Sequence, residues 1–343
     1  MLAFLSPVYA AAVAARGRLY DGGWLAVARL DVPVISVGNL TAGGSGKSPM
    51  VELIARILAQ RGHAPAVVSR GYGGSHSGRA TVVSDGRGPL VDAGVAGDEP
   101  VMLATALTGV PVIVSRRRRN GGELAVARYR SRCVVLDDAF QHRALARDLD
   151  LLLLDGAEPF GNGRLLPAGP LREPVSAMAR AGAIVITRAD RAGSSSRDAI
   201  ARAAERHCPA APIFEARTEP AALIDLASGE ALPVSRLAGA RVVCFAGIAR
   251  PDRFFEDAAR AGAEVAAAFP FPDHHRFGAA DLDAIAAAAS RLGADLILTT
   301  QKDAARLDGP AAAGRLPRLH ALRVATTIDE HDSFASLVES AAS

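Results

Sequence analysis

Short apolar runs alternate with helically spaced segments through the first part of the chain. Continuous apolar runs rich in β-branched residues are typical of strands buried on both faces, and they occupy residues 32–37, 66–69, 110–115, 133–137, 149–155 and 183–187. Between several of these runs, apolar residues recur at helical spacing. Residues 48–61 are the clearest case, and Gly62 follows them as a stop signal. The pattern predicts an α/β fold, with a mostly parallel sheet covered by helices on both faces.

The composition changes around residues 209–220, where we expect a linker strand. A second α/β series follows, with strands predicted at 241–246, 265–269, 296–299 and 319–324 and helices at 252–261 and 280–292. We therefore expect an N-terminal region over residues 1–30, a first domain over 31–212 and a smaller α/β domain over 213–328. The last strands belong either to the smaller domain or, returning, to the first.

The composition narrows the classes of function. With 343 residues, 50% hydrophobic and 22% charged, the chain can bury a large core. A net charge of +3 is too small to indicate nucleic acid as a partner, and 5% aromatic residues offer few platforms for base stacking. Cys133, Cys208 and Cys244 are too widely spaced to predict a disulfide framework or a zinc site, which fits a reducing compartment. Lysine occurs only at Lys47 and Lys302, so arginine supplies nearly all of the positive charge.

Residues 1–15 form an apolar run that is followed by Arg16 and Arg18. The run is shorter than the ~20 residues of a spanning helix, and its positive charge follows rather than precedes it, unlike a secretory signal. We expect a helix lying on a membrane surface, with Arg16, Arg18 and Arg29 near anionic headgroups. The alternative is a helix docked on the protein's own core.

The segment V-G-N-L-T-A-G-G-S-G-K-S-P, residues 37–49, lies between a predicted strand and a predicted helix. This is the context of a P-loop of the NTPase type, in which glycines let backbone amides approach phosphate oxygens at a helix N-terminus. Lys47 is expected to reach the β- and γ-phosphates and Ser48 to ligate Mg²⁺. Thr41 occupies the position of the usual first glycine. The expected nucleotide-binding residues are Thr41, Ala42, Gly43, Gly44, Ser45, Gly46, Lys47 and Ser48.

Two acidic pairs are candidates for the chemistry. The strand V-V-L-D-D ends in Asp137 and Asp138, as a Walker B strand does, and either carboxylate could hold Mg²⁺. The motif G-D-E-P places Asp98 and Glu99 after a glycine-rich stretch, where one could accept a proton from an attacking hydroxyl while the other holds metal. The alternative for Asp98 is a helix N-cap.

Three further motifs leave alternatives open. The motif D-H-H-R, residues 273–276, indicates acid–base work or phosphate contact, or else a solvated turn. The run R-R-R-R, residues 116–119, could receive an anionic substrate or form a solvated face. The motif T-R-A-D, residues 187–190, is similar to the guanine-reading [NT]-K-x-D motif with Arg in place of Lys, which supports a rival function: a P-loop GTPase or a partitioning-type ATPase switch.

With these motifs in place, the chain resembles the tetraacyldisaccharide 4′-kinase family of lipid A biosynthesis. Besides the P-loop segment, the matching stretches are S-R-G-Y-G, G-D-E-P, L-D-D-A-F-Q-H-R, N-G-R-L-L-P-A-G-P-L-R-E-P, F-A-G-I-A-R-P-D-R-F-F, F-P-D-H-H-R-F and T-T-Q-K-D-A-A-R-L. They follow one another in order over most of the chain. Thr41 is this family's own usage, whereas Ala139 departs from it, because the family pattern has Gly there.

The resemblance implies phosphorylation of the 4′-hydroxyl of a tetraacyldisaccharide 1-phosphate, with ATP and Mg²⁺, by a peripheral enzyme on the cytoplasmic face of the inner membrane. It implies that Asp98 acts as base together with a histidine of the smaller domain, with His274 the first choice and His275 the second. It defines no oligomeric state. The Mg²⁺ ligands that it implies are Ser48, Glu99 and Asp137 or Asp138. The candidates for the glycolipid headgroup are Arg70, Tyr72, Gln141, His142, Arg172 and residues 117–119 of the arginine run.

Overall fold

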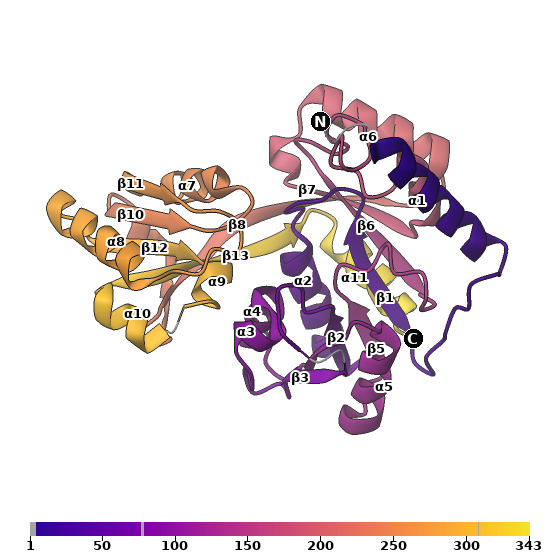
Figure 1. The fold of residues 1–343 in the computed structure, drawn as a ribbon, viewed down its shortest axis with the longest axis horizontal. Coiled ribbons are helices and arrows are strands. Elements are labelled where there is room, and N and C mark those ends of the chain that lie inside the picture. The colour runs from indigo at the N-terminus through magenta and orange to yellow at the C-terminus, as the bar shows by residue number, and fades with distance from the viewer. Residues whose placement is uncertain (1–4, 77–78, 308) are drawn as a thin grey trace.

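The computed structural model describes residues 5–76, 79–307 and 309–343, and its strands join in one sheet of thirteen in these ranges (Figure 1). The strands are β1 (Val34–Asn39), β2 (Pro65–Ser69), β3 (Thr81–Ser84), β4 (Val112–Val114), β5 (Cys133–Leu136), β6 (Leu149–Asp155), β7 (Ala183–Thr187), β8 (Ile213–Asp225), β9 (Ala231–Pro233), β10 (Arg241–Ala246), β11 (Glu264–Pro270), β12 (Leu296–Thr300) and β13 (Leu319–Ile328). Their order across the sheet is β11-β10-β12-β13-β8-β7-β6-β1-β5-β2-β4-β3, and β9 pairs with β8.

The α-helices connect and cover these strands. They are α1 (Ser6–Asp21), α2 (Lys47–Gln60), α3 (Ala93–Ala96), α4 (Asp98–Ala106), α5 (Arg118–Tyr129), α6 (Ser194–His207), α7 (Pro251–Arg260), α8 (Ala279–Leu292), α9 (Gln301–Ala304), α10 (Gly309–Arg315) and α11 (His331–Ala341).

In the first part of the molecule, strands β7, β6, β1, β5, β2 and β4 run parallel, and β3 pairs antiparallel with β4 at the edge. Successive side chains of β1 point to opposite faces, so Ile35 and Val37 pack with α2, α4 and α11, while Val34 packs in the core that contains α5. Because both faces are covered, β1, β5 and β6 are buried along their whole length. This explains why they read as continuous apolar runs.

Strands β8 and β13 connect this part to the smaller one (Figure 1). The first residues of β8 pair with β7, and β13 runs antiparallel to β8 from the His320–Asp225 pair to the Ile328–Ala216 pair. The predicted linker strand is therefore present, and it is one of two strands that both parts share. The boundaries at 212/213 and 328 remain a prediction, since the sheet continues across the first of them.

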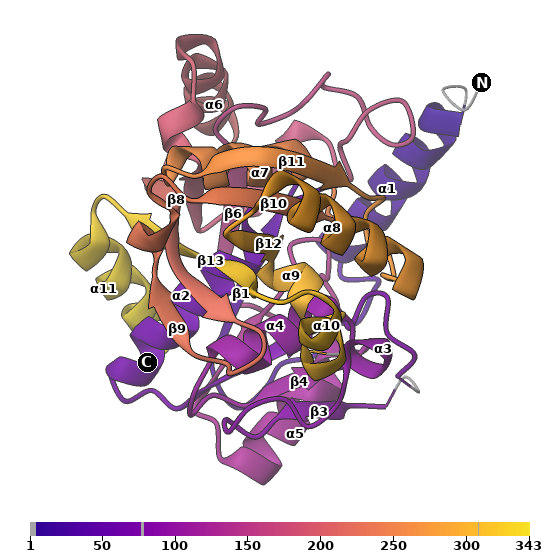
Figure 2. The same ribbon diagram turned by 90° about the vertical axis from the view of Figure 1, so that its left-hand side faces the viewer.

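The smaller part is a second α/β layer arrangement (Figure 2). Strands β11, β10, β12 and β13 run parallel there. One face of β10 packs on α7 through Phe254, and the other face packs on α8 through Leu282. Helix α9 follows β12 and contacts α4 of the first part, so the carboxyl end of β12 points toward the P-loop side of the molecule.

Helix α1 lies against the first part through polar contacts. The Tyr9 hydroxyl donates to the carbonyl of Arg172 at 2.9 Å, and Arg16 donates to the carbonyl of Gln141 at 3.0 Å. None of its residues is buried, and Val8 is 67% exposed. The predicted run of residues 1–15 thus forms a helix from Ser6 onward, and residues 1–4 lie outside the described ranges. Among the helices described, none is both long and apolar enough to cross a membrane.

Candidate active site

The predicted phosphate-binding loop connects the carboxyl end of β1 to the amino end of α2. Gly43 and Gly46 have φ angles of +112° and +77°, a left-handed backbone that glycine adopts without steric cost. Helix α2 begins at Lys47, and Pro49 lies in its first turn, where the missing N–H removes no helical hydrogen bond. The loop from Thr41 to Ser48 thus has the strand–loop–helix geometry that binds phosphate at a helix N-terminus.

Lys47 is buried at the edge of the sheet where β1 and β5 both end. Its Nζ lies 3.5 Å from Oδ1 of Asn39, the last residue of β1, and 3.6 Å from Oδ1 of Asp138, which follows β5. Because β1 and β5 are parallel neighbours, their carboxyl ends meet at this edge. The structure therefore brings the lysine of the loop and the acidic pair together.

Asp137 and Asp138 have opposite electrostatic surroundings. Both oxygens of Asp138 accept hydrogen bonds from Nη1 of Arg172, at 2.8 and 2.9 Å. Burial acts to raise the pKa of Asp138, but Lys47 and Arg172 outweigh it, so the net shift is downward. Burial raises the pKa of Asp137 to about 6, and the nearby carboxylates of Glu99 and Asp138 add to the effect. Cations of the protein thus outweigh burial at Asp138, whereas burial and the neighbouring carboxylates outweigh the effect of Lys47 at Asp137.

Asp137 also has an oxygen without a partner. Its Oδ2 accepts a hydrogen bond from Oγ of Ser69 at 2.8 Å, while Oδ1 is buried with no hydrogen-bond partner in the described part of the chain. A buried carboxylate oxygen left free in this way suits a divalent cation. Within the described ranges no three His, Cys, Asp or Glu side chains cluster as a metal cage. Mg²⁺ needs no such cage, since it is usually held by one or two carboxylates together with phosphate oxygens and water. The residues present fit Mg²⁺.

Asp98 is fixed by a tight backbone contact at the start of α4. The preceding residue, Gly97, has a φ of +89°, and a Cβ atom there would lie 2.4 Å from the carbonyl oxygen of Tyr72. Glycine is therefore required where the loop of the S-R-G-Y-G motif crosses the amino end of α4. Asp98 itself is almost fully buried, and its Oδ1 accepts a hydrogen bond from the amide of Glu99.

His274 is the histidine that meets Asp98. Its Nδ1 lies 3.0 Å from Oδ2 of Asp98, although 176 residues separate the two in the chain. The backbone of His274 is left-handed, with a φ of +60°, a conformation uncommon for a residue with a side chain and frequent at functional sites. Its amide donates to the carbonyl of Gly247 at 3.0 Å, which holds the turn. His275 points elsewhere: its Nε2 lies 3.0 Å from Oδ2 of Asp281, and its ring stacks on Phe271.

Two cations of the segment T-T-Q-K-D-A-A-R complete the surroundings of Asp98. Nζ of Lys302 lies 3.9 Å from Oδ2 of Asp98 and 3.2 Å from Oε1 of Glu99. Nε of Arg306 lies 3.7 Å from Oδ2 of Asp98, and its Nη2 donates to the carbonyl of Gly247. No role was predicted for Arg306 from the sequence. The signal that could have indicated one is its spacing of four residues from Lys302, which places the two side chains on the same side of a helical turn.

Besides residues 117–119, the candidates for the glycolipid headgroup are Arg70, Tyr72, Gln141, His142 and Arg172, which come from three separate segments of the chain. The exposed ring of Tyr72 lies 6.1 Å from the ring of His274. Gln141 donates to the carbonyl of Asn39 at 2.9 Å and to Glu173 at 3.2 Å. Arg172 is held by Asp138, as described above. The other two candidates are Arg70 and His142, which are close enough for Arg70 to lower the pKa of the histidine.

In two of the predicted motifs, the arginine run and the T-R-A-D motif, an arginine side chain binds groups of the protein itself. Within the arginine run, Arg118 is buried and donates to the carbonyl of Asp137 at 2.8 Å, so this residue does not belong to a solvated face, whereas Arg119 is exposed and pairs with Glu123. In the T-R-A-D motif, Arg188 forms an ion pair with Asp155 and donates to the carbonyl of Gly44 at 2.8 Å. Arg188 therefore supports the P-loop backbone.

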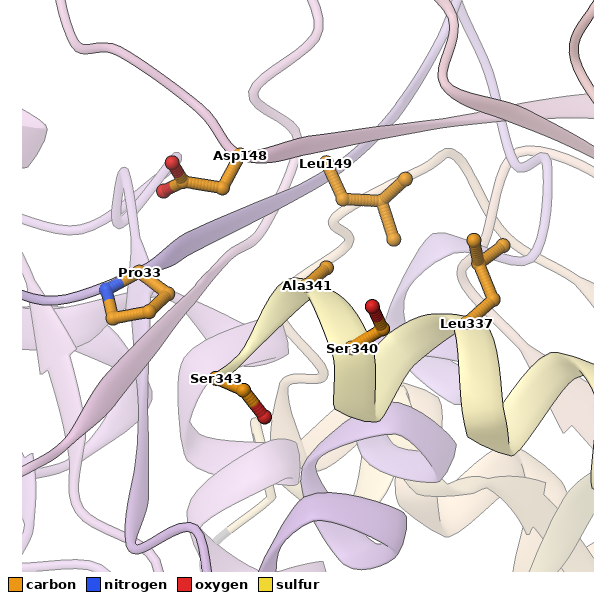
Figure 3. Close-up of a pocket in the computed structure, with 7 residues that line it drawn as sticks. All are labelled: Pro33, Asp148, Leu149, Leu337, Ser340, Ala341 and Ser343. Carbon is orange, nitrogen blue, oxygen red and sulfur yellow. The ribbon is translucent and has the colours of Figure 1, made fainter.

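A surface hollow of about 500 Å³ lies away from these residues (Figure 3). It is bordered by Pro33 and Leu149, at the amino ends of β1 and β6, and by Leu337 and Ala341 of α11. Its only acidic lining residue, Asp148, is already used, because it accepts a hydrogen bond from the amide of Val34 and pairs with Arg29. Because the P-loop follows the carboxyl end of β1, the hollow is at the opposite edge of the sheet and is not the candidate active site.

Comparison with known proteins agrees with this geometry. The family model for tetraacyldisaccharide-1-P 4′-kinase matches residues 1–343. A tetraacyldisaccharide 4′-kinase of Anaeromyxobacter dehalogenans is 48% identical over 316 residues, covering 92% of this chain and 83% of the relative. The kinase of Geobacter metallireducens is 45% identical over 310 residues, covering 90% and 88%.

The structural comparison gives the same answer. A crystal structure of LpxK from Aquifex aeolicus, described as an "apo" form in complex with ATP, superposes with a TM-score of 0.80 at 30% identity, covering 100% of this chain and 98% of that chain. This confirms the predicted fold class, a mostly parallel α/β sheet of the P-loop type with a smaller α/β part. Ala139, the departure from the family pattern, is buried, and the left-handed residue in this turn is Asp138, with a φ of +48°. Position 139 therefore accommodates alanine.

The surroundings of His142 predict an acid-dependent loss of stability. Burial lowers the pKa of His142 from 6.5 to about 4, and Arg118, Arg147 and further arginines lower it as well. The imidazole is therefore neutral in the folded protein at neutral pH, while in the unfolded chain it gains a proton below about pH 6.5. Stability that is present above pH 6.5 is lost as the pH falls toward the folded value. Allowing for partial exposure, we expect a loss of about 1–2 kcal/mol.

The measurement is urea unfolding of the wild type and of His142→Gln, whose side chain does not titrate. Between pH 6.5 and 4 the free energy of unfolding of the wild type should fall more steeply than that of the variant. Parallel profiles would contradict the assignment of a depressed pKa to His142.

Proposed function

Because the chain belongs to the tetraacyldisaccharide-1-P 4′-kinase family, we propose how its residues divide the work of phosphoryl transfer. The enzyme transfers the γ-phosphoryl group of ATP, in the presence of Mg²⁺, to the 4′-hydroxyl of a tetraacyldisaccharide 1-phosphate, a step of lipid A biosynthesis. A partitioning-type GTPase or ATPase switch is not favoured. The observation that carries the assignment of the catalytic residues is the contact between Asp98 and His274.

The P-loop residues from Thr41 to Ser48 hold the triphosphate. Their backbone amides and the N-terminus of α2 favour negative charge, and the buried Lys47 ammonium neutralises the phosphate oxygens. Before nucleotide arrives, Asn39 and Asp138 hold Lys47 at the sheet edge. Arg172 holds Asp138 in turn, so that Lys47 is oriented by a network that does not depend on ligand.

Asp137 and Ser48 would hold Mg²⁺, and Glu99 would contribute negative charge beside them. The partnerless Oδ1 of Asp137 supports this choice over Asp138, whose two oxygens already accept from Arg172. When bound, Mg²⁺ neutralises charge on the phosphate oxygens. Ser69 fixes the orientation of the Asp137 carboxylate by donating to its other oxygen.

Asp98 and His274 act as a pair on the acceptor hydroxyl. The Asp98 carboxylate accepts the Nδ1–H of His274, which leaves Nε2 as the ring nitrogen that can accept a proton. As the 4′-hydroxyl oxygen attacks the γ-phosphorus, its proton passes to this pair. The carboxylate of Asp98 is almost fully buried, and Nε of Arg306 lies 3.7 Å from its Oδ2.

The enzyme works at a membrane surface on the cytoplasmic face of the inner membrane. A tetraacylated substrate resides in lipid, and the exposed apolar side chains on and just after α1 offer a surface to lipid: Val8, Leu19, Trp24 and Val27. Arg18 lies on the same helix and would meet anionic headgroups. Arg16 and Arg29 are less free to do so, because they pair with Gln141 and Asp148.

The catalytic pair is tested by single substitutions. Asp98→Ala and His274→Ala should each lower turnover by ~10²-fold or more, because each removes a group that handles the proton, while ATP binding stays nearly unchanged. Turnover is measured as transfer of labelled γ-phosphate to the lipid A disaccharide precursor. Lys47→Ala is the positive control for lost nucleotide binding.

His275→Ala is the matched control, because its side chain pairs with Asp281 and not with Asp98. It should keep turnover within about threefold of the wild type. If His274→Ala retains wild-type turnover while His275→Ala does not, the assignment of the pair is wrong.

Membrane contact is tested by flotation with vesicles that contain anionic phospholipid. The double variant Val8→Glu/Leu19→Glu should bind several-fold less than the wild type, because it places charge on the proposed lipid-facing surface. The control is Leu90→Glu, an exposed leucine on the loop after β3. Equal binding of the wild type and the double variant would show that α1 is not the contact.

A further inference from the structure

Lys302 is one of only two lysines in the chain, and the phosphate-transfer assignments above leave it without a role. It lies on α9, directly after β12, at the contact between the two parts of the molecule. Its Nζ is 3.2 Å from Glu99, 3.8 Å from Asp273 and 3.9 Å from Asp98. Two of these carboxylates belong to α4 of the first part, and the third belongs to the turn that carries His274.

These three carboxylates would repel one another without a cation between them. Asp98 is almost fully buried and Lys302 is largely buried, so solvent screens their charges weakly. Burial acts to lower the pKa of Lys302, but the carboxylates of Glu99, Asp98 and Asp273 outweigh it, and the net shift is upward. The side chain therefore carries its positive charge throughout the working pH range of an enzyme.

Arg306 and His274, the other basic groups around Asp98, are each bound to the backbone of the smaller part. Arg306 is tied to Asp303 and to the carbonyl of Gly247, so its guanidinium is anchored within the smaller part. The backbone N–H of His274 donates a hydrogen bond to the same carbonyl. Among the described cations near Asp98, Lys302 reaches both Glu99 and Asp273, and thus spans the boundary between the two parts. A compact ammonium on a flexible stem can be shared in this way, whereas a planar guanidinium favours one carboxylate.

We propose that Lys302 is a positioning residue of the kinase reaction, whose ammonium joins Glu99 and Asp98 to the His274 turn and so holds the catalytic pair together. The proposal rests on the proposed function, because it assumes that Asp98 and His274 are the catalytic pair. Lys302 acts through this pair and through the orientation of Glu99, not on the reacting atoms. Its removal takes away the cation that contacts both Glu99 and Asp273, so that these carboxylates repel each other and the His274 turn moves away from α4.

The test is the steady-state kinetics of Lys302→Met, which keeps roughly the length of the side chain and removes its charge. We expect kcat to fall by ~10-fold or more with little change in KM for ATP, because the P-loop is untouched. Lys302→Arg restores the positive charge, but its guanidinium favours one carboxylate. Its kcat should therefore lie between those of the wild type and Lys302→Met, again with little change in KM for ATP.

A second measurement covers the case in which Lys302→Met folds poorly. The double variant Lys302→Met/Asp273→Asn removes one of the repelling carboxylates but keeps an oxygen that can accept the amide of His274. It should be more active than Lys302→Met alone. The matched control is Arg315→Met, which breaks an exposed ion pair with Asp283 on α8 and should leave both kcat and KM for ATP unchanged.

These variants distinguish a wrong assignment of the catalytic pair from a wrong role for Lys302. If Asp98→Ala and His274→Ala retain turnover, the catalytic pair itself is wrong. If these two variants lose turnover while Lys302→Met keeps the kcat of the wild type, the pair stands and the role of Lys302 is refuted. A Lys302→Met variant that changes KM for ATP as strongly as kcat, or a double variant no more active than Lys302→Met, also refutes it.

Discussion

The site depends on the contact between the buried carboxylate of Asp98 and basic side chains from the other part of the molecule. Asp98 belongs to the P-loop part, yet His274, Lys302 and Arg306, which contact it, all come from the smaller part. Neither part carries both members of the proposed catalytic pair. The paired strands β8 and β13 connect the two parts, and α9 of the smaller part contacts α4 of the first. This contact places the basic side chains of the smaller part next to Asp98.

The nucleotide half of the site could be predicted from the sequence because its signals are local. The loop, the lysine and the acidic pair each follow a strand, and parallel neighbouring strands bring such positions to one edge. The choice between Asp137 and Asp138 could not be made in this way. It depends on Arg172, which lies 34 residues from Asp138 in the chain and takes up both of its oxygens.

The residues around the acceptor hydroxyl, Asp98 and His274, were harder to predict because they meet only through the tertiary fold. His274 and His275 are adjacent in the chain, yet their side chains point to different partners. The backbone of His274 is left-handed, and its amide donates to the carbonyl of Gly247, a tertiary contact that the sequence pattern does not reveal. Arg118 illustrates the same limit, since a run of four arginines suggests a solvated face although one of them is buried against the carbonyl of Asp137. The fold was more predictable because burial on both faces produces continuous apolar strands. The short edge strand β3, between glycine-rich loops, has no such pattern and was missed.

The measurement that tests this account most directly is a double-mutant cycle on the catalytic pair, using Asp98→Asn and His274→Gln with kcat for phosphate transfer as the readout. Two groups that handle one proton together act as a unit, so the double variant should be about as slow as the slower single variant. ATP affinity, measured alongside, should be the same in all four proteins. If the two losses instead multiply in the double variant, Asp98 and His274 act independently, and the contact between the two parts of the sheet is not the centre of the mechanism.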